Sequence, residues 1–261
     1  MSALRAESAT VRLGGSEVVR EASVAVTPGR VVALIGPNGA GKSSLLGALS
    51  GELRPSAGHV TLDGAAISSF SPMALARRRA VLAQATELAF AFTVDEVARL
   101  GHPPGLPRAE ADALVEACLA TVDLAGAGGR VCAALSGGER QRAHLARVLG
   151  QLRAAPDGRP RYLMLDEPTT GLDLAHQLAT LDLARRHASE GGGVLAVLHD
   201  VNLAAMAADE IVAMKAGRVI AKGPPAEVLT DAVMRAVYDV EVRVGVAPPG
   251  PFLLPQAARR S

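Results

Sequence analysis

The fold of this chain is decided by one stretch, Gly36-Pro37-Asn38-Gly39-Ala40-Gly41-Lys42-Ser43-Ser44. It follows an apolar run, Val31–Ile35, and leads into a helix-compatible segment. The spacing GxxxxGK[ST] between a strand and a helix predicts a loop that binds phosphate. Glycines let such a backbone curl around an anion, and the N–H groups that open the helix point toward it. We therefore expect Lys42 to reach the β- and γ-phosphates of a nucleotide and the Ser43 hydroxyl to bind Mg²⁺.

The composition limits what else the chain can be. Of its 261 residues, 49% are apolar and 2% aromatic, so one large or two small cores must be built from aliphatic side chains. A net charge of +1 disfavours bulk electrostatic binding, and we expect no nucleic-acid partner. Cys118 and Cys132 lack CxxC spacing and are expected to be reduced, partly buried thiols. No apolar stretch approaches the ~20 residues of a membrane helix, so any membrane role would come through a partner.

Polar residues follow other apolar, strand-like runs. Tyr162–Leu165 leads into Asp166 and Glu167, and Val194–Leu198 leads into His199. Parallel sheets place ligands at the carboxyl ends of their strands. We expect Asp166 to help hold Mg²⁺ and Glu167 to act as general base on the attacking water. A lone histidine is more often structural, but its place after a second central strand favours contact with phosphate.

A helix is predicted to begin at Leu135-Ser136-Gly137-Gly138-Glu139. Ser136 and Glu139 have the spacing of a capping box. Glycines in a first turn weaken a helix, so this pair is expected where a phosphate approaches the backbone N–H groups. An ordinary helix start is the alternative interpretation of the same residues.

The remaining segments predict a mixed α/β domain. A hairpin is expected from Ala9–Leu13 and Ser16–Val26, and another from Glu210–Lys222. Between Gln84 and about Ala155 only helical patterns occur. A helix is expected to begin at Ser71-Pro72 and to carry Arg77-Arg78-Arg79 on a solvated face. His102-Pro103 could be taken for a haem ligand, but a proline-rich linker is the favoured interpretation.

In chain order these motifs resemble the ATP-binding cassette (ABC) ATPases, from about Ala3 to Val244. The Walker A, Q-loop, signature, Walker B, D-loop and H-switch elements would be Gly36–Ser44, Gln84, Leu135–Glu139, Asp166–Glu167, Gly171–Asp173 and His199. The chain is most similar to importer ATPases of the iron-siderophore, cobalamin and haem type, and among these to the haem (hemin) importers. That similarity is carried by the stretches Val11–Gly15, Leu88–Val97, Ser136–Arg147, Gly150–Arg161 and Leu172–Gln177.

The resemblance implies an α/β P-loop NTPase fold. A RecA-like core with a mixed central sheet would span residues 3–84 and 156–244, with an antiparallel β subdomain at its N-terminus. An inserted helical subdomain would span 85–155, and 245–261 would be a tail. The implied function is ATP hydrolysis coupled to haem import. Import of a ferric siderophore or cobalamin is the first alternative, and a soluble ABC ATPase without a permease is the second.

The resemblance also implies a shared site between two copies of the chain. Each ATP would lie between Gly36–Ser44 of one copy and Ser136–Glu139 of the other, with Asp173 crossing the interface. Gln84 would sense Mg²⁺ and the lytic water as well as bind the metal, and His199 would steady the γ-phosphate. The expected partners are two copies of a membrane permease and, through it, a periplasmic binding protein, at the cytoplasmic face of the inner membrane.

One position departs from the family pattern. Many ABC ATPases have an aromatic residue near position 13 that stacks on adenine, and this chain has Leu13 there. We expect an apolar contact with the base in place of stacking.

Overall fold

A computed structural model describes residues 2–84, 90–154, 158–247, 249–251 and 254–255. Its centre is a six-stranded sheet with the strand order β10-β9-β3-β8-β7-β6. Five of these strands are parallel, and only β10 runs antiparallel, to its neighbour β9. Their bounds are β3 Val31–Ile35, β6 Arg79–Leu82, β7 Tyr162–Asp166, β8 Gly193–Val197, β9 Glu210–Lys215 and β10 Arg218–Gly223. Every residue of β3, β7 and β8 is buried, which explains their continuous apolar sequences.

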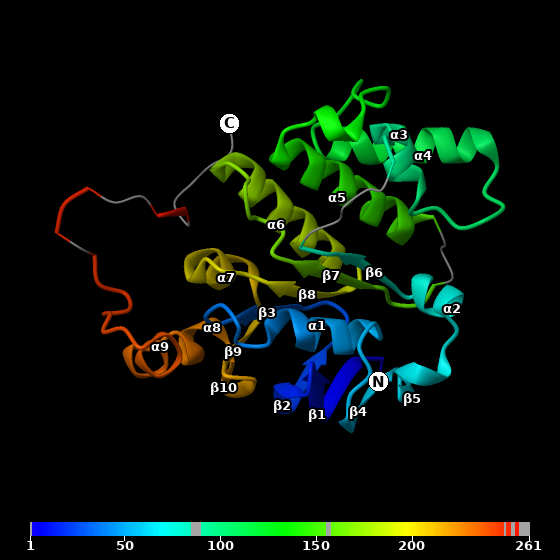
Figure 1. Ribbon diagram of the computed structural model, residues 1–261. Helices are drawn as coiled ribbons and strands as arrows, with labels where there is room; N and C mark the ends of the chain where they lie inside the picture. The colour runs from blue at the N-terminus through cyan, green and yellow to red at the C-terminus, as the bar shows by residue number, and fades with distance from the viewer. Residues whose placement is uncertain (1, 85–89, 155–157, 248, 252–253, 256–261) are drawn as a thin grey trace.

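A second sheet packs near the N-terminus, in the order β2-β1-β4-β5, and all its pairs are antiparallel. Its strands are β1 Leu4–Leu13, β2 Ser16–Val26, β4 Ala57–Leu62 and β5 Ala65–Ala66. In Figure 1 this sheet and α1 (Lys42–Ser50) lie on one side of the central sheet, and the larger helices lie on the other side. The fold is thus a mixed central sheet with an antiparallel N-terminal sheet, as the family resemblance implies.

Two apolar cores fill the two faces of the central sheet. One core joins the sheet to β1, β2 and α1. The other joins the opposite face to the remaining helices apart from α2 (Pro72–Ala76). These helices are α3 Val94–Arg99, α4 Arg108–Thr121, α5 Gly137–Arg153, α6 Leu174–Ser189, α7 Val201–Ala207, α8 Pro225–Val228 and α9 Asp231–Tyr238. Between residues 90 and 154 the elements are helical, joined by one short 3-10 turn, Cys132–Ala134. A second such turn, Ile67–Ser69, precedes α2.

Several local predictions are confirmed. Ser71 caps α2, because its side chain accepts a hydrogen bond from the N–H of Ala74 at 3.2 Å. The hairpin of β9 and β10 turns at Ala216-Gly217. Both cysteines are free and buried. The predicted tail, 245–261, and the stretch after Gln84 lie partly outside the described residues.

The solvated face predicted for the arginine triplet is wrong. Helix α2 ends at Ala76, and Arg78 is 5% exposed. Its guanidinium lies 2.5 Å from the Asp63 carboxylate and donates to the carbonyl of Pro160. Arg79 already belongs to β6 and donates to the carbonyl of Ser50. The triplet therefore joins α2 to the edge of the central sheet, and only Arg77 is exposed.

Candidate active site

Two glycines of the loop between β3 and α1 lie where the neighbouring backbone leaves no room for a side chain. A Cβ on Gly36 would lie 2.1 Å from the carbonyl oxygen of Met214, and one on Gly41 would lie 2.2 Å from that of Val18. Their φ angles of 145° and 95° are also ones that other residues rarely adopt. Gly39, with φ 77°, has open space around its Cβ position. The loop is thus held between β9 and β2 by close backbone approach.

Lys42 is the first residue of α1 and is 5% exposed. Its ammonium group donates to the carbonyl oxygens of Gly36 at 2.8 Å and Pro37 at 2.9 Å. Burial lowers its pKa, and the nearby carboxylates of Glu167 and Asp166 oppose that shift. The side chain therefore lies curled along the inside of the loop that the sequence assigns to phosphate.

Ser43 and Asp166 meet across the gap between α1 and β7. The Ser43 hydroxyl donates to Oδ1 of Asp166 at 2.9 Å. Asp166 is 7% exposed, and burial raises the pKa of its carboxyl group. The side chains of Ser43 and Asp166 offer oxygen donors of the kind that Mg²⁺ binds, and Gln84 contacts the neighbouring Glu167 through its amide nitrogen.

Glu167 follows β7 with a positive φ of 52°. Its Oε1 lies 2.5 Å from Nε2 of His199, and its Oε2 accepts from Nε2 of Gln84 at 2.8 Å. Its carbonyl accepts from the side-chain amide of Gln141 at 3.1 Å. The ends of β6, β7 and β8 therefore bring Gln84, Glu167 and His199 together, as the strand pattern predicts.

Several of these residues line a cavity of about 370 Å³, and among the described residues Asp166, Gly36 and Pro37 are not part of its walls. Its walls are Val18, Asn38, Gly39, Ala40, Gly41, Lys42, Ser43, Ser44, Gln84, Glu167 and His199. Within the described residues, that lining includes neither Leu13 nor any of Ser136, Gly137, Gly138 and Glu139. Leu13 ends β1 and is 44% exposed. One copy of the chain thus assembles the loop, the carboxylates and the histidine, but not the predicted signature.

The predicted signature does begin a helix, α5, through a complete capping box. The Ser136 hydroxyl accepts from the N–H of Glu139 at 3.2 Å, and the Glu139 carboxylate accepts from the N–H of Ser136 at 2.9 Å. The two glycines differ. A Cβ on Gly137 would meet no atom of the described chain within 4 Å, whereas one on Gly138 would lie 3.3 Å from Leu172. The open side of Gly137 leaves room for an approaching group, and Gly138 packs against its own chain.

Asp173 caps the next helix, α6. Its carboxylate accepts from the N–H of His176 at 2.9 Å and lies 2.8 Å from Nδ1 of the same histidine. His102 lies in the turn between α3 and α4, where a Cβ on Gly150 would be 3.1 Å from its Nε2. Burial lowers the pKa of His102.

The sequence did not predict two residues of the site, Val18 and Gln141. Val18 lines the cavity from β2, and its carbonyl fixes how closely Gly41 and Gly217 approach. Gln141 holds the backbone of Glu167 from α5. Gln141 lies three positions after Gly138, and nothing local in the sequence indicates its partner.

The arrangement has the parts of a phosphate-hydrolysing site. A curled loop with a lysine can hold phosphates, and a serine and aspartate can hold a metal ion. A carboxylate at the end of the neighbouring strand can accept a proton from water. Histidine and glutamine side chains fix the position of that carboxylate.

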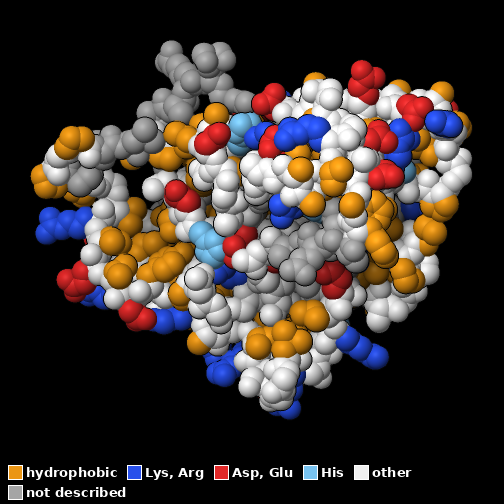
Figure 2. Space-filling view, turned by 45° about the horizontal axis from the view of Figure 1, so that its top comes forward, with side chains coloured by type: hydrophobic (Ala, Val, Ile, Leu, Met, Phe, Trp, Pro, Cys, Tyr) orange, Lys and Arg blue, Asp and Glu red, His pale blue; other side chains and the backbone are white. Residues whose placement is uncertain are grey.

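Figure 2 shows acidic and basic side chains interspersed on the face it presents. On α3 and α4, Arg99 forms ion pairs with Asp95 and Asp112. Within the described residues, no helix combines the length and apolar character needed to cross a membrane.

Comparison with known proteins agrees with this geometry. A family model described as ABC transporter matches residues 19–170. The hemin import ATP-binding protein HmuV of Rhizobium meliloti (strain 1021) is 50% identical over 259 residues, covering 98% of this chain and 99% of that protein. A protein of the same name from Jannaschia sp. (strain CCS1) is 47% identical and covers 99% and 96%, respectively.

Solved structures show the same fold. The structure of an ATP binding subunit of an ABC transporter has a TM-score of 0.75 and 26% identity, covering 91% of this chain and 94% of the other. A bacterial Atm1-family ABC exporter with ATP bound has a TM-score of 0.77 and 25% identity, covering 92% and 42%. The chain therefore belongs to the ABC transporter family and is an ATPase of that family.

Proposed function

We propose that this chain is the ATP-hydrolysing subunit of a haem importer. The observation that carries the proposal is the 50% identity, over nearly the full length of both chains, to a hemin import ATP-binding protein. Similarity over that length covers the helical part of the chain as well as the nucleotide loop. Ferric siderophore and cobalamin import are the alternatives that the cargo experiment below must separate.

The proposed nucleotide site is Gly36–Ser44, with the phosphates held by the loop N–H groups and by Lys42. The hydrogen bonds of Lys42 to Gly36 and Pro37 support this role, because they hold its ammonium group inside the loop. Ser43, Asp166 and Gln84 would hold Mg²⁺, and the oxygen donors of this set suit that ion. When bound, Mg²⁺ would neutralise charge on the phosphates. The apolar contact of Leu13 with adenine stays a prediction.

Glu167 is the proposed general base. Its carboxylate is positioned by His199 and Gln84, so it is held at the cavity wall where a water molecule beside the γ-phosphate would lie. His199 would in addition steady the γ-phosphate. A base in such a position accepts a proton as water attacks phosphorus, and the proton then leaves with phosphate.

The proposed working unit is a head-to-tail homodimer. One chain's cavity lacks Ser136, Gly137, Gly138 and Glu139 among its described walls, and the open side of Gly137 leaves room for a phosphate held by a second copy. The Ser136 hydroxyl accepts from the N–H of Glu139 and also hydrogen-bonds the Glu139 carboxylate, so it would turn its proton from that carboxylate to the phosphate. Asp173 would cross the dimer interface.

The helical stretch 85–155 would act as the subdomain that carries the signature within the cassette, 3–244. We further propose two copies of a permease as partners and, through them, a periplasmic binding protein. Such an assembly would place this chain at the cytoplasmic face of the inner membrane.

The test is reconstitution of the chain with its permease and binding protein in vesicles. Haem, a ferric siderophore and cobalamin would each be offered outside, while ATP hydrolysis and cargo uptake are followed together. The proposal expects haem alone to accelerate ATPase activity and to accumulate inside. Stimulation by cobalamin or a ferric siderophore but not by haem would replace the proposed cargo.

A further inference from the structure

Arg130 connects the starts of two helices. Its backbone carbonyl accepts from the N–H of Val94, the first residue of α3, at 2.9 Å. The carbonyl of Gly128 accepts from the next N–H, that of Asp95, at the same distance. The Arg130 side chain points the other way, and its Nη1 lies 2.7 Å from Oε1 of Glu139 at the start of α5. The backbone of Arg130 is thus bonded to the start of α3, and its guanidinium lies at the start of α5.

Both of these helices begin with a capping box, which provides a comparison inside the same chain. In α3 the Thr93 hydroxyl accepts from the N–H of Glu96 at 3.3 Å, and the Glu96 carboxylate accepts from the N–H of Thr93 at 2.8 Å. In α5, Ser136 and Glu139 make the same two bonds at 3.2 and 2.9 Å. The two boxes share these two bonds. In α3 the Thr93 hydroxyl also donates to the Glu96 carboxylate at 3.0 Å, and the boxes differ as well in the charge beside the glutamate.

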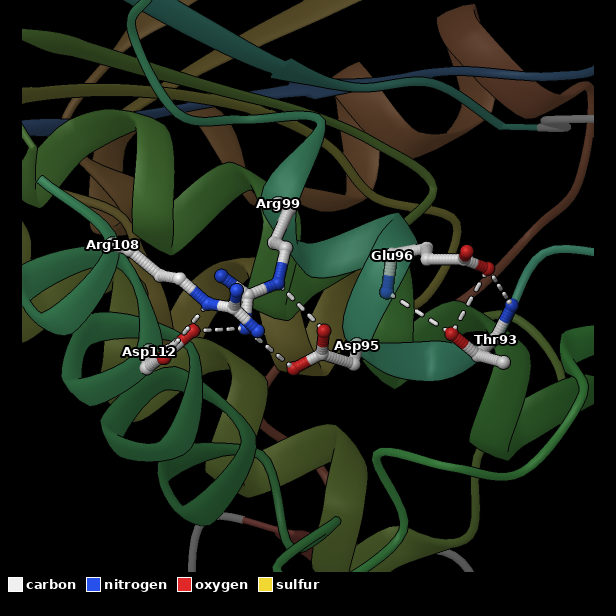
Figure 3. Close-up of polar contacts among 6 residues, drawn as sticks. All are labelled: Thr93, Asp95, Glu96, Arg99, Arg108 and Asp112. Carbon is white, nitrogen blue, oxygen red and sulfur yellow. Dashed lines mark hydrogen bonds and ion pairs between the residues drawn. The ribbon is translucent and has the colours of Figure 1, made fainter. Parts of the chain in front are cut away.

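Figure 3 shows that the α3 box closes without an arginine. The guanidinium of Arg99 is directed away from Glu96 and binds Asp95 at 2.6 Å and Asp112 at 2.5 Å. Within the described residues, Glu96 forms no ion pair. A capping box in this chain therefore forms without a cation, so the start of α5 does not by itself account for the pairing of Arg130 with Glu139.

The need for that cation follows from what the start of α5 is proposed to bind. A helix N-terminus offers roughly half a positive charge. The Glu139 carboxylate already occupies it, and a γ-phosphate arriving at Ser136 and Gly137 would bring further negative charge to the same turn. Pairing with Arg130 and hydrogen bonding to Ser136 hold the pKa of Glu139 at about 2, so the carboxylate is ionised at neutral pH. Without a neighbouring cation, the two anions would repel each other.

We propose that Arg130 is a positioning residue of the signature turn. By pairing with Glu139 it cancels the carboxylate charge at the start of α5, so that this turn accepts the γ-phosphate of a nucleotide held by a second copy of the chain. The inference rests on the proposed function, since it requires that ATP meets the signature of a partner copy.

The test measures the ATP concentration dependence of hydrolysis by the reconstituted transporter. Arg130→Gln leaves one uncompensated carboxylate and is expected to raise the KM for ATP on the order of tenfold. That defect is expected to shrink as salt rises, because salt screens repulsion between exposed charges. The matched control is Arg108→Gln on α4, since the Arg108 side chain is 95% exposed and 3.9 Å from its nearest carboxylate. It is expected to behave as the wild type.

Two further variants separate charge from structure. Glu139→Gln keeps the capping box, which glutamine also closes. In the Arg130→Gln background it is expected to bring the KM back to within about threefold of the wild type, because it removes the charge that the arginine cancels. Alone, Glu139→Gln is expected to lower the KM for ATP, because it removes the negative charge of the turn while Arg130 keeps its positive charge. This single variant tests the inference even if Arg130→Gln fails to fold.

The outcomes are distinguishable. A normal KM in Arg130→Gln, no rescue in the double variant, a defect independent of salt, or an unchanged or raised KM in Glu139→Gln would each overturn the role of Arg130. Failure of the proposed function shows elsewhere, as a wild-type transporter that hydrolyses no ATP or as a Ser136→Ala variant with wild-type kinetics.

Discussion

The Glu167 carboxylate has its two oxygens engaged by two different strand ends. Nε2 of His199 lies 2.5 Å from Oε1, and Nε2 of Gln84 donates to Oε2 at 2.8 Å. Three strands that are far apart in sequence therefore converge on one carboxylate. The positive φ of Glu167 turns the chain sharply after β7, and Gln141 holds that turn by its bond to the Glu167 carbonyl.

Replacing Glu167 with Gln should separate binding from chemistry. Glutamine has nearly the same shape but cannot accept a proton from water, so turnover is expected to fall by about 10²–10⁴-fold. ATP binding should persist, because Lys42 and the loop are untouched. Steady-state hydrolysis and equilibrium binding of ATP measure the two effects. Turnover close to that of the wild type would remove Glu167 as the base.

Two glycines of the nucleotide loop should respond differently to alanine. Gly41→Ala would place a methyl group 2.2 Å from the Val18 carbonyl, and we expect a loss of more than about 3 kcal/mol in the free energy of unfolding. Gly39→Ala has open space and only an unfavourable φ, so about 1–2 kcal/mol is expected. Urea unfolding without nucleotide measures both. Equal losses would contradict the close approach at Gly41.

The arginine triplet offers a matched pair of variants. Arg78→Ala would leave the partly buried Asp63 carboxylate and the Pro160 carbonyl without their donor, and about 3 kcal/mol of destabilisation is expected. Arg77→Ala, at an exposed position one residue away, should change the free energy of unfolding by less than about 0.5 kcal/mol. The urea midpoints of the two variants test the buried ion pair. Similar midpoints would mean that Arg78 acts as a surface residue.

His144 should make the protein less stable in mild acid. It is 5% exposed on α5, and burial, aided by Arg147 and Arg140, lowers its pKa from 6.5 to about 4. Between these values the unfolded chain binds a proton and the folded chain does not. Its contribution is therefore complete above about pH 6.5 and is lost as the pH falls toward 4, by up to about 3 kcal/mol.

The comparison is with His144→Leu, measured by urea unfolding from pH 7 to pH 4. The variant should lose less stability over this range than the wild type. The shifts of His102 and His187 are also caused by burial and act in the same direction, but they are present in both proteins and cancel in the difference. Parallel pH profiles would show that His144 is not buried in its neutral form.

The sequence was sufficient for features that depend on neighbouring residues. The loop of Gly36–Ser44, the strand ends at Asp166 and His199, and the capping box of Ser136 were all predicted, because each has a local pattern with a local physical cause. The family resemblance then implied the mixed central sheet, the antiparallel N-terminal subdomain and the inserted helices, but not the order of the strands.

Features that depend on distant partners could not be predicted. Nothing beside Arg78 indicates that Asp63 and Pro160 will enclose it, and the solvated face expected for it was wrong. Val18 was missed because its carbonyl meets Gly41 only after β2 packs beside the loop. The bond of Gln141 to Glu167 likewise requires α5 to lie against the end of β7.

The internal bonds of the site have a consequence for how it selects its ligand. Lys42, Ser43 and Glu167 each already have a partner within the chain. An incoming triphosphate therefore exchanges one set of polar contacts for another, and its affinity reflects only the difference between the two sets. The same bonds that position the Glu167 carboxylate occupy both of its oxygens, so one of these bonds must give way before the carboxylate can accept a proton from water.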